Sequence, residues 1–270
     1  MIEGISILER LRTCQNQVFK AMLHGELCVL RLTDPDHRSR LGLQTELDLL
    51  KDLQAVTTTV IQPIPFPSGG YIQTISYDDK IYNGMLFSFI DGSPATIFSY
   101  AEAARFGYRL ATLHTAFAKL SNHYDLPVME NFSVKNQLIH GDFNPTNVLA
   151  TDHSLVVVDF ENACYSNYEY EIANSIYMTL FDKRHDLAEL IDSEFVGGFL
   201  AGYTREKPLD LVRVREAIDE RVSMLQLWLK DLASAPLVIA NSPESWRKQL
   251  EEFVASYADG TFKDVVASVV

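Results

Sequence analysis

The 270-residue sequence has few cysteines, no long apolar run and fewer basic than acidic residues. Its three cysteines, Cys14, Cys28 and Cys164, form no CxxC pair, which argues against a disulfide framework or a zinc site. No segment approaches the ~18 consecutive apolar residues that a membrane-spanning helix needs. The first residues, Met1–Gly4, lack the basic start and apolar stretch of a secretory signal. We therefore expect a cytoplasmic protein with reduced thiols and no membrane insertion.

Lysine and arginine are outnumbered by aspartate and glutamate, 23 against 36, which gives a formal net charge of −13. Because nucleic-acid backbones require a basic face, this balance argues against a nucleic-acid partner. The deficit is uneven: residues 1–91 carry 8 basic and 11 acidic residues, whereas residues 92–270 carry 15 and 25. Solubility alone accounts for such a charge. The alternative is an acidic pocket in the second part that suits a cationic small molecule.

Residues 1–91 are predicted to form a small β-rich lobe with one helix. Apolar runs flank the turn His24–Glu26, which indicates a hairpin. Leucines at helical spacing place a helix at roughly residues 40–54, and further strands are expected near 71–75 and 85–90.

The periodicity becomes mainly helical after Asp91–Pro94, the best candidate for a boundary. Helices are expected from about residue 100 to 124 and from 171 to 182. With 47% hydrophobic residues the chain has enough apolar material for a large domain or two lobes. The expected class is α+β, with residues 1–91 in one lobe and 92–270 in the other.

The segment from His140 to Asn147 has the sequence HGDFNPTN, in which an aspartate and an asparagine are separated by four residues. That spacing is typical of phosphoryl-transfer loops. In such loops the aspartate accepts the proton of the substrate hydroxyl, and the asparagine oxygen binds a magnesium ion on the ATP phosphates. Asp142 and Asn147 fit these two roles. The alternative is that both residues only form turns, as these residue types commonly do.

Two short strands follow the loop, at roughly residues 147–150 and 155–160, and the second delivers Asp159 from an apolar run. One carboxylate and one amide oxygen suffice for Mg²⁺, because this ion prefers hard oxygen ligands and keeps several waters. Turn formation alone does not explain an aspartate that a hairpin returns toward the same loop. The sequence thus predicts an ATP- and Mg²⁺-dependent phosphotransferase with Asp142, Asn147 and Asp159 as catalytic residues, the last two as metal ligands.

These motifs resemble those of the aminoglycoside phosphotransferase and choline kinase family. HGDFNPTN matches the family's catalytic loop, VVDFENACYSNYEYEIANSI its metal-binding strand and next helix, and FGYRLATLHTAF the preceding helix. VLRLTDPDHRS and TELDLL are similar to its third strand and the helix facing that strand. The resemblance implies a bilobal protein-kinase-like fold, with the nucleotide in a cleft between a small β-rich N-lobe and a larger helical C-lobe. It also implies the same roles for Asp142, Asn147 and Asp159.

The resemblance assigns the adenine-binding hinge to Leu86–Gly92, where backbone groups of Ser88, Phe89 and Ile90 would contact the base. It gives His140 a scaffold role in shaping the catalytic loop.

Arg31 stands where the family commonly has a lysine that holds the ATP phosphates, and the resemblance pairs Glu46 with it. The alternative is a strand charge and a helix charge that never meet. Arginine keeps the charge, but its planar fork changes the phosphate geometry. The phosphate-covering loop at residues 11–16 contains no glycine, another departure from the pattern. Glu161 is expected either to help position magnesium or an acceptor ammonium, or to be a solvated loop charge.

Aromatic residues in the last part of the chain are candidates for an acceptor wall, because their rings attract protonated or quaternary amines. Packing in the core is the alternative for each of them. They are Tyr168, Tyr170, Tyr177, Trp228 and Trp246.

The predicted function is phosphorylation of a small-molecule hydroxyl. The expected acceptor is cationic, such as an aminoglycoside, an amino alcohol like choline or ethanolamine, or a related metabolite. The alternative is a catalytically inactive nucleotide-binding or interaction protein, which the arginine at position 31 favours. Protein phosphorylation is less expected, because no long activation segment separates Asp159 from the helix at 171–182. The expected oligomeric state is a monomer or homodimer.

Overall fold

The computed structural model describes residues 4–13, 16–129, 137–182, 194–235 and 237–258. The chain forms two compact units, each of which is described by itself. The first comprises Met1–Pro94, Ala116–Pro127 and Asn147–Ala163. The second comprises Ala95–Thr115, Val128–Thr146 and Cys164–Val270. The predicted division into lobes at residues 91 and 92 stays a prediction.

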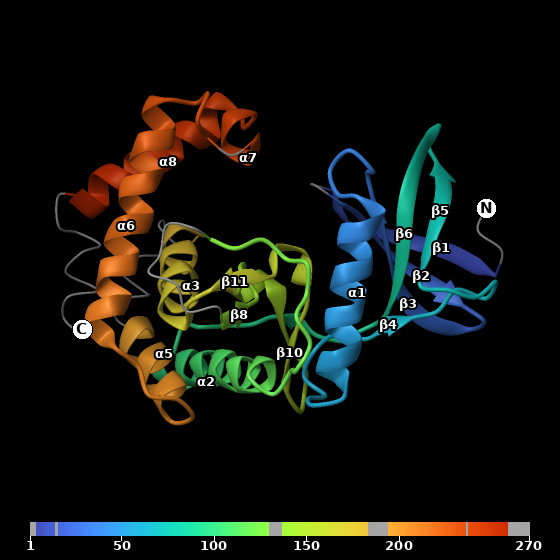
Figure 1. Cartoon of the computed structure of the whole chain (residues 1–270), viewed down its shortest axis with the longest axis horizontal. Coiled ribbons are helices and arrows are strands. Elements are labelled where there is room, and N and C mark those ends of the chain that lie inside the picture. Colours follow the sequence, from blue (N-terminus) through green and yellow to red (C-terminus); the bar gives the residue numbers. More distant parts are fainter. Residues whose placement is uncertain (1–3, 14–15, 130–136, 183–193, 236, 259–270) are drawn as a thin grey trace. The chain divides into compact units, whose positions relative to one another are not determined.

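The first unit is built on a six-stranded antiparallel sheet in the order β1-β2-β3-β6-β4, with β5 also paired to β6 (Figure 1). Its strands are β1 (Ile5–Thr13), β2 (Asn16–Leu23), β3 (Glu26–Thr33), β4 (Pro63–Ile64), β5 (Ile72–Tyr77) and β6 (Lys80–Ser88). The predicted hairpin is confirmed: His24 and Gly25 join β2 to β3 at positive φ angles of 50° and 90°. Strand β1, which the sequence did not predict, lies at the edge of the sheet.

Helix α1 (Arg40–Gln54) follows β3 and confirms the helix predicted from leucine spacing. The Ser39 side chain caps it by accepting a 3.1 Å hydrogen bond from the Gly42 N–H. Leu43, Leu47 and Leu50 form its buried face.

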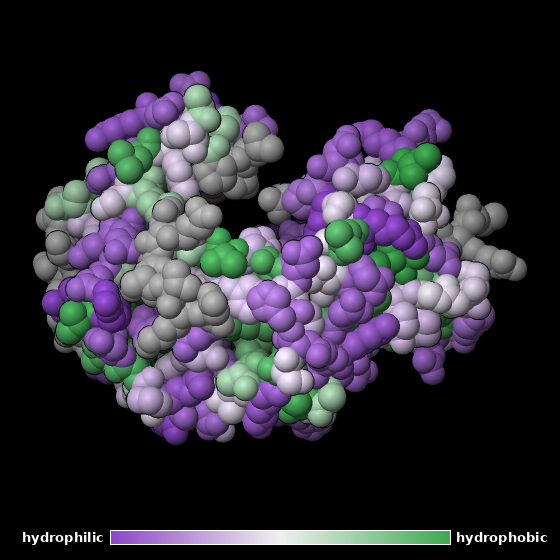
Figure 2. Space-filling view, viewed as in Figure 1, coloured by the Kyte–Doolittle hydropathy of each residue, from purple (hydrophilic) through white to green (hydrophobic). Residues whose placement is uncertain are grey.

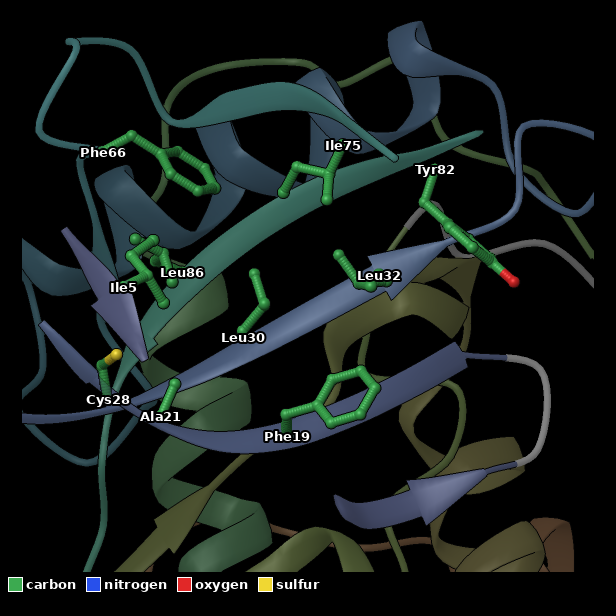
Figure 3. Packing of buried hydrophobic residues seen from close by; sticks show 10 residues of the cluster. All are labelled: Ile5, Phe19, Ala21, Cys28, Leu30, Leu32, Phe66, Ile75, Tyr82 and Leu86. Atoms are coloured by element: carbon green, nitrogen blue, oxygen red, sulfur yellow. The ribbon is translucent and has the colours of Figure 1, made fainter. Parts of the chain in front are cut away.

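One face of the sheet carries the hydrophobic core of this unit (Figure 3). Phe19, Leu30 and Leu86 occupy one row across β2, β3 and β6, and each is at most 1% exposed. Each such side chain contributes about 1.5–3 kcal/mol through burial. The opposite face of the same strands carries Arg31 beside the buried side chains of Met85 and Phe87, which are 1% and 4% exposed.

A smaller three-stranded sheet in the first unit joins β7 (Ser93–Pro94), β9 (Val148–Ala150) and β10 (Leu155–Val157). The strand predicted at residues 155–160 is shorter than expected. It ends at Val157 because Asp159 has a left-handed backbone, with φ of 65°, and the 3₁₀ turn η2 (Phe160–Asn162) follows.

The second unit is mainly helical, with one two-stranded sheet. Its strands are β8 (Gln137–Ile139) and β11 (Cys164–Ser166). Its helices are α2 (Tyr100–Phe117), α3 (Tyr168–Asp182), α5 (Phe195–Thr204), α6 (Leu211–Lys230), α7 (Leu237–Ala240) and α8 (Glu244–Ala258). The last two residues of α2 belong to the first unit. The helix predicted to reach residue 124 ends at Phe117, because the N–H groups of Lys119 and Leu120 bond to carbonyls only three residues back. The predicted α+β class is confirmed.

Two glycines allow α2 and α5 to pack backbone against backbone. A Cβ atom at Gly107 would lie 1.9 Å from the Phe199 carbonyl oxygen, and one at Gly202 would lie 1.9 Å from the Ala104 carbonyl oxygen. Since neither backbone can yield by that much, only glycine fits at these two positions.

Hydrophilic residues predominate on the face shown in Figure 2, where hydrophobic ones are scattered. In the described part of the chain, no helix combines the length and the apolar composition that crossing a membrane requires.

Candidate active site

The loop that carries Asp142 belongs to the second unit and follows β8. Gly141 has a φ of 81°, a left-handed conformation that favours glycine. The Asn144 side-chain amide donates to the Asp142 carboxylate at 2.9 Å and to the Asp142 carbonyl at 3.2 Å. In turn the Asn144 side-chain oxygen accepts from the Thr146 N–H at 2.9 Å. The loop thereby holds the half-buried Asp142 carboxylate in one orientation.

Polar side chains of helix α3 form hydrogen bonds with the main chain of this loop. The fully buried Glu171 carboxylate accepts hydrogen bonds from the main-chain N–H of His140 at 3.0 Å and of Gly141 at 2.6 Å. Ser175, one turn further on, donates to the Phe143 carbonyl at 2.6 Å. Main-chain groups on both sides of Asp142 are therefore bonded to one rigid helix.

Glu171 also bonds to His114 of α2, at 2.7 Å from its Nε2, and both side chains are fully buried. Burial opposes the charge of Glu171, but the hydrogen bond from His114 and the N–H of His140 hold the pKa of Glu171 below its ordinary value. Burial lowers the pKa of His114 despite the adjacent carboxylate. A neutral His114 that donates from Nε2 accepts at Nδ1 from the Tyr203 hydroxyl, 2.8 Å away. The network is therefore an ionised glutamate with a neutral histidine.

Asn147 and Asp159 lie in the first unit, at the open end of the β9–β10 hairpin. Val148 pairs with Val157, and the Val158 N–H donates to the Asn147 carbonyl at 3.0 Å. The hairpin therefore places the main chain of Asn147 beside Val158, the residue before Asp159. Asn147 is buried, whereas the Asp159 side chain is 23% exposed.

Arg31 and Glu46 form a buried bidentate ion pair in the first unit, which excludes the alternative of two charges that never meet. Both terminal nitrogens of Arg31 lie 2.8 Å from a Glu46 oxygen. Burial works against the charge of Arg31, but the Glu46 carboxylate outweighs it and raises the pKa of Arg31 above its ordinary value. Nη1 of Arg31 is also 3.9 Å from Oδ1 of Asp159. The structure thus brings together Arg31, Glu46 and Asp159.

Glu161 is not a solvated loop charge, because its side chain is only 8% exposed. Its carboxylate accepts from the Asn16 amide at 2.6 Å and lies 3.8 Å from His37. Its carbonyl accepts from Arg38 at 2.5 Å, and Arg38 is in turn 3.5 Å from Glu46. Glu161 therefore connects the turn after Asp159 to Asn16 in β2 and to Arg38, just before α1, through hydrogen bonds. Burial of this glutamate had no signal in the sequence.

Of the predicted hinge residues, Ser88 ends β6 and Phe89 and Ile90 follow it; all three are half-buried. The Ser88 N–H already donates to the Gln62 carbonyl at 2.8 Å. The ring of Phe89 lies 4.5 Å from the ammonium of Lys20. Contacts of Ser88, Phe89 and Ile90 with adenine stay a prediction.

The aromatic residues proposed for an acceptor wall lie in the second unit, and their contacts favour packing. Tyr170 and Tyr177 are 3% and 5% exposed, and the Arg221 guanidinium lies over both rings, 5.9 and 5.3 Å from their centroids. Tyr168 stacks on His114 at 4.0 Å, with the ammonium of Lys207 5.0 Å from its ring. These rings already contact cations of the chain itself.

Asp159 and Asn147 offer one carboxylate and one amide as possible metal ligands. In the segments that the structure describes, three or more His, Cys, Asp or Glu nowhere gather as a metal cluster. Such a donor set suits an ion that takes one or two protein oxygens together with phosphate and water, as Mg²⁺ does.

The β-sheet unit, the helical unit and the HGDFNPTN loop have the features of kinase-like phosphotransferases, with Arg31 in place of the lysine in the ion pair with glutamate. The model of the phosphotransferase enzyme family, APH, matches residues 99–217, a segment that includes Asp142, Asn147 and Asp159. No curated protein matches the sequence. The match confirms the resemblance stated above and the predicted class, a small-molecule phosphotransferase.

Solved structures of small-molecule kinases share the fold at low identity. An amicoumacin kinase in complex with AMP-PNP, Ca²⁺ and Ami is 15% identical, with a TM-score of 0.71 over 96% of this chain and 89% of that one. A microcompartment-associated aminopropanol kinase is also 15% identical, with a TM-score of 0.71 over 97% and 94%. A Plasmodium vivax ethanolamine kinase is 12% identical, with a TM-score of 0.62 over 97% and 84%. These likenesses confirm the predicted protein-kinase-like fold.

Stability should depend on pH through His114. The folded chain keeps this histidine neutral, because burial lowers its pKa, whereas the unfolded chain protonates it near pH 6.5. Below about pH 6.5 the unfolded state therefore binds the extra proton, and the free energy of unfolding falls by at most about 1.4 kcal/mol per pH unit. The stability that the neutral His114 contributes is constant above about pH 6.5. It declines as the pH falls from there toward the lowered pKa of His114 in the folded state.

The measurement is the thermal unfolding midpoint between about pH 5.5 and 7.5, a range above the ordinary carboxylate titration. His114→Gln, which can still donate to Glu171, should flatten the slope, whereas His153→Gln, at an exposed histidine in the β9–β10 turn, should leave it unchanged. Equal slopes in the wild type and His114→Gln would contradict this account.

Proposed function

We propose that this chain transfers the γ-phosphoryl group of ATP, with Mg²⁺, to a hydroxyl group of a small molecule. Asp142 is the general base: its carboxylate accepts the proton of the acceptor hydroxyl as that oxygen attacks phosphorus. Asn147 and Asp159 would hold the metal ion, which would supply charge neutralisation at the phosphates. Phe89, with its neighbours Ser88 and Ile90, would contact the adenine.

The observation that carries this proposal is the support of the Asp142 loop. A base has to keep its carboxylate at a fixed place, because proton transfer requires hydrogen-bond distance to the acceptor hydroxyl. The Asn144 amide fixes the carboxylate, and Glu171 and Ser175 fix the main chain on either side. The buried, ionised Glu171 that accepts from the main chain of this loop therefore supports a catalytic role for the loop over simple turn formation.

The acceptor is proposed to carry a protonated or quaternary amine. Residues after position 160 include 19 acidic and 11 basic residues, so this part of the chain attracts cations. Among the kinases with a similar fold, the aminopropanol and ethanolamine kinases are named for amino alcohols. Both observations support a cationic acceptor and leave its identity to experiment.

Replacing the proposed base tests the function most directly. Asp142→Asn should lower kcat by ~10²–10⁴, the usual range for a lost general acid–base group, while ATP binding changes little. ADP release with a panel of amino alcohols and amino sugars gives turnover, and calorimetric titration gives ATP affinity. Near-full turnover in the variant would show that Asp142 is not the base. An inactive nucleotide-binding protein would bind Mg·ATP but release no ADP with any acceptor.

The metal assignment predicts unequal effects at its two ligands. Asp159→Ala should remove the gain in ATP affinity that Mg²⁺ provides, about tenfold or more, because a neutral residue cannot balance the metal charge. Asn147→Ala should lose less, since water can replace an amide oxygen. ATP titrations with Mg²⁺ and with a chelator measure this gain, with Asp152→Ala in the exposed turn of the same hairpin as the control. Equal and small effects at both positions would refute the assignment.

The charge of the acceptor predicts a dependence on salt. Because exposed charges are screened over ~10 Å at 0.1 M salt, the Michaelis constant of an amine acceptor should rise with ionic strength. The comparison is 3-aminopropan-1-ol with the uncharged propane-1,3-diol, each assayed from low to high salt. A preferred acceptor that is neutral or anionic would end this part of the proposal and leave the phosphotransferase assignment intact.

A further inference from the structure

The guanidinium group of Arg12 lies beside the proposed metal ligand. Its Nη1 is 3.4 Å from Oδ2 of Asp159, and the Arg12 side chain is 54% exposed. Arg31 reaches the other oxygen of the same carboxylate, at 3.9 Å. Asp159 therefore lies between two arginines that come from different strands of the sheet.

An irregularity in β1 turns Arg12 toward this position. In a regular strand, residues 10 and 12 would point to the same face. Here Arg10 pairs with Phe19 but Arg12 pairs with Val18, so the register shifts between them by one residue. Such a bulge re-aims the side chains that follow it. Val18 in turn pairs with Arg31, and paired residues share a face, so Arg12, Val18 and Arg31 form one row on the face opposite Phe19 and Leu30.

Arg10 stays on the other face of the sheet. Its guanidinium lies 5.5 Å from the centroid of the Phe19 ring and donates to the Tyr77 hydroxyl at 3.0 Å. Phe19 is part of the hydrophobic core shown in Figure 3. Two arginines of one strand are thus separated by the bulge, and only Arg12 reaches Asp159.

The donors of Arg31 are largely committed, whereas those of Arg12 are not. Both terminal nitrogens of Arg31 bond to Glu46, one also contacts the Met85 sulfur at 3.4 Å, and the side chain is 7% exposed. Among the described residues, the one ion pair of Arg12 is with Asp159. A guanidinium has five N–H donors in a fork that matches phosphate oxygens. Arg12 therefore has exposed donors available for a phosphate group next to Asp159.

We propose that Arg12 binds the phosphate groups of the nucleotide, an inference that rests on the proposed function. Arg12 would donate to phosphate oxygens through the N–H groups that its contact with Asp159 leaves available. Asp159 would hold the metal ion, which would neutralise charge on the phosphates. Residues 11–13, which the sequence analysis assigned to a phosphate-covering loop, belong to β1, so Arg12 would contact the phosphates from a strand. Arg31 acts beside Arg12, mainly by orienting Glu46 and Asp159.

The test compares the affinities of Mg·ATP, metal-free ATP and adenosine in calorimetric titrations of the full chain. Arg12→Met should weaken Mg·ATP binding by about ten- to a hundredfold, the range for a lost hydrogen bond to a charged group, and leave adenosine binding unchanged. Arg12→Lys keeps the positive charge but loses the planar guanidinium, so its affinity for Mg·ATP should lie between those of Arg12→Met and the wild type. Arg10→Met, on the same strand but the other face, should bind Mg·ATP like the wild type.

Two results would overturn the role of Arg12. Arg12→Met could bind Mg·ATP as tightly as the wild type and Arg10→Met do, or it could weaken adenosine and ATP equally, as a structural defect would. A wild-type chain that binds no nucleotide would refute the proposed function itself, so the two failures are distinguishable. Metal-free ATP adds a further check, because a phosphate contact from Arg12 persists in a chelator, whereas an effect through Asp159 and the metal disappears.

Discussion

The Glu171 carboxylate accepts hydrogen bonds from two main-chain N–H groups of the loop that carries Asp142 and from His114, with no exposure to solvent. A buried charge of this kind is tolerated only when donors surround it, because its desolvation costs several kcal/mol. The same requirement fixes the loop, since any displacement of residues 140 and 141 would leave the carboxylate without partners. The main chain just before Asp142 is thus held by a residue that is 29 positions away from Asp142 in the sequence.

The first unit contains a buried cation that is stabilised by an acidic partner, as the buried Glu171 is stabilised by hydrogen-bond donors. Arg31 is buried and remains charged because Glu46 meets it with two short hydrogen bonds, and Arg38 adds a second cation near the same carboxylate. Asp159 has a left-handed backbone, which aspartate tolerates better than most residues, and Glu161 anchors the turn that contains it. Since these groups are linked through one chain of ion pairs and hydrogen bonds, a change at Glu46 or Glu161 acts on the geometry of Asp159.

The features that sequence analysis predicted are those with local signals. The β2–β3 hairpin has a glycine turn between two apolar runs, α1 has a leucine at each turn, and the hairpin before Asp159 has an apolar strand. The pairing of Arg31 with Glu46 came from the family resemblance, and the geometry bears it out. Strand β1 was missed because it lies at the sheet edge, where a bulge interrupts the alternation of apolar and polar residues.

Long-range polar partners left no such signal. Glu171, His114 and Tyr203 lie on three different helices, and nothing in their spacing says that they meet. Glu171 looks like a first-turn acidic residue of a helix, a common and unremarkable place for a glutamate. Glu161 likewise resembled an exposed turn residue until its contacts with Asn16 and Arg38 were known. Burial of a charge depends on tertiary packing, which composition and periodicity do not encode.

The cations that lie over Tyr168, Tyr170 and Tyr177 change how an amine acceptor would be recognised. A ring face gains most from a cation when both are removed from water, and Arg221 and Lys207 already hold positions over these rings. A positively charged acceptor near them would meet like charge. Attraction of such a substrate therefore depends on the carboxylates of this part of the chain and not on the three tyrosines. Because carboxylates act through a longer-ranged, screened field, recognition of this kind is sensitive to ionic strength, whereas an enclosed aromatic box is not.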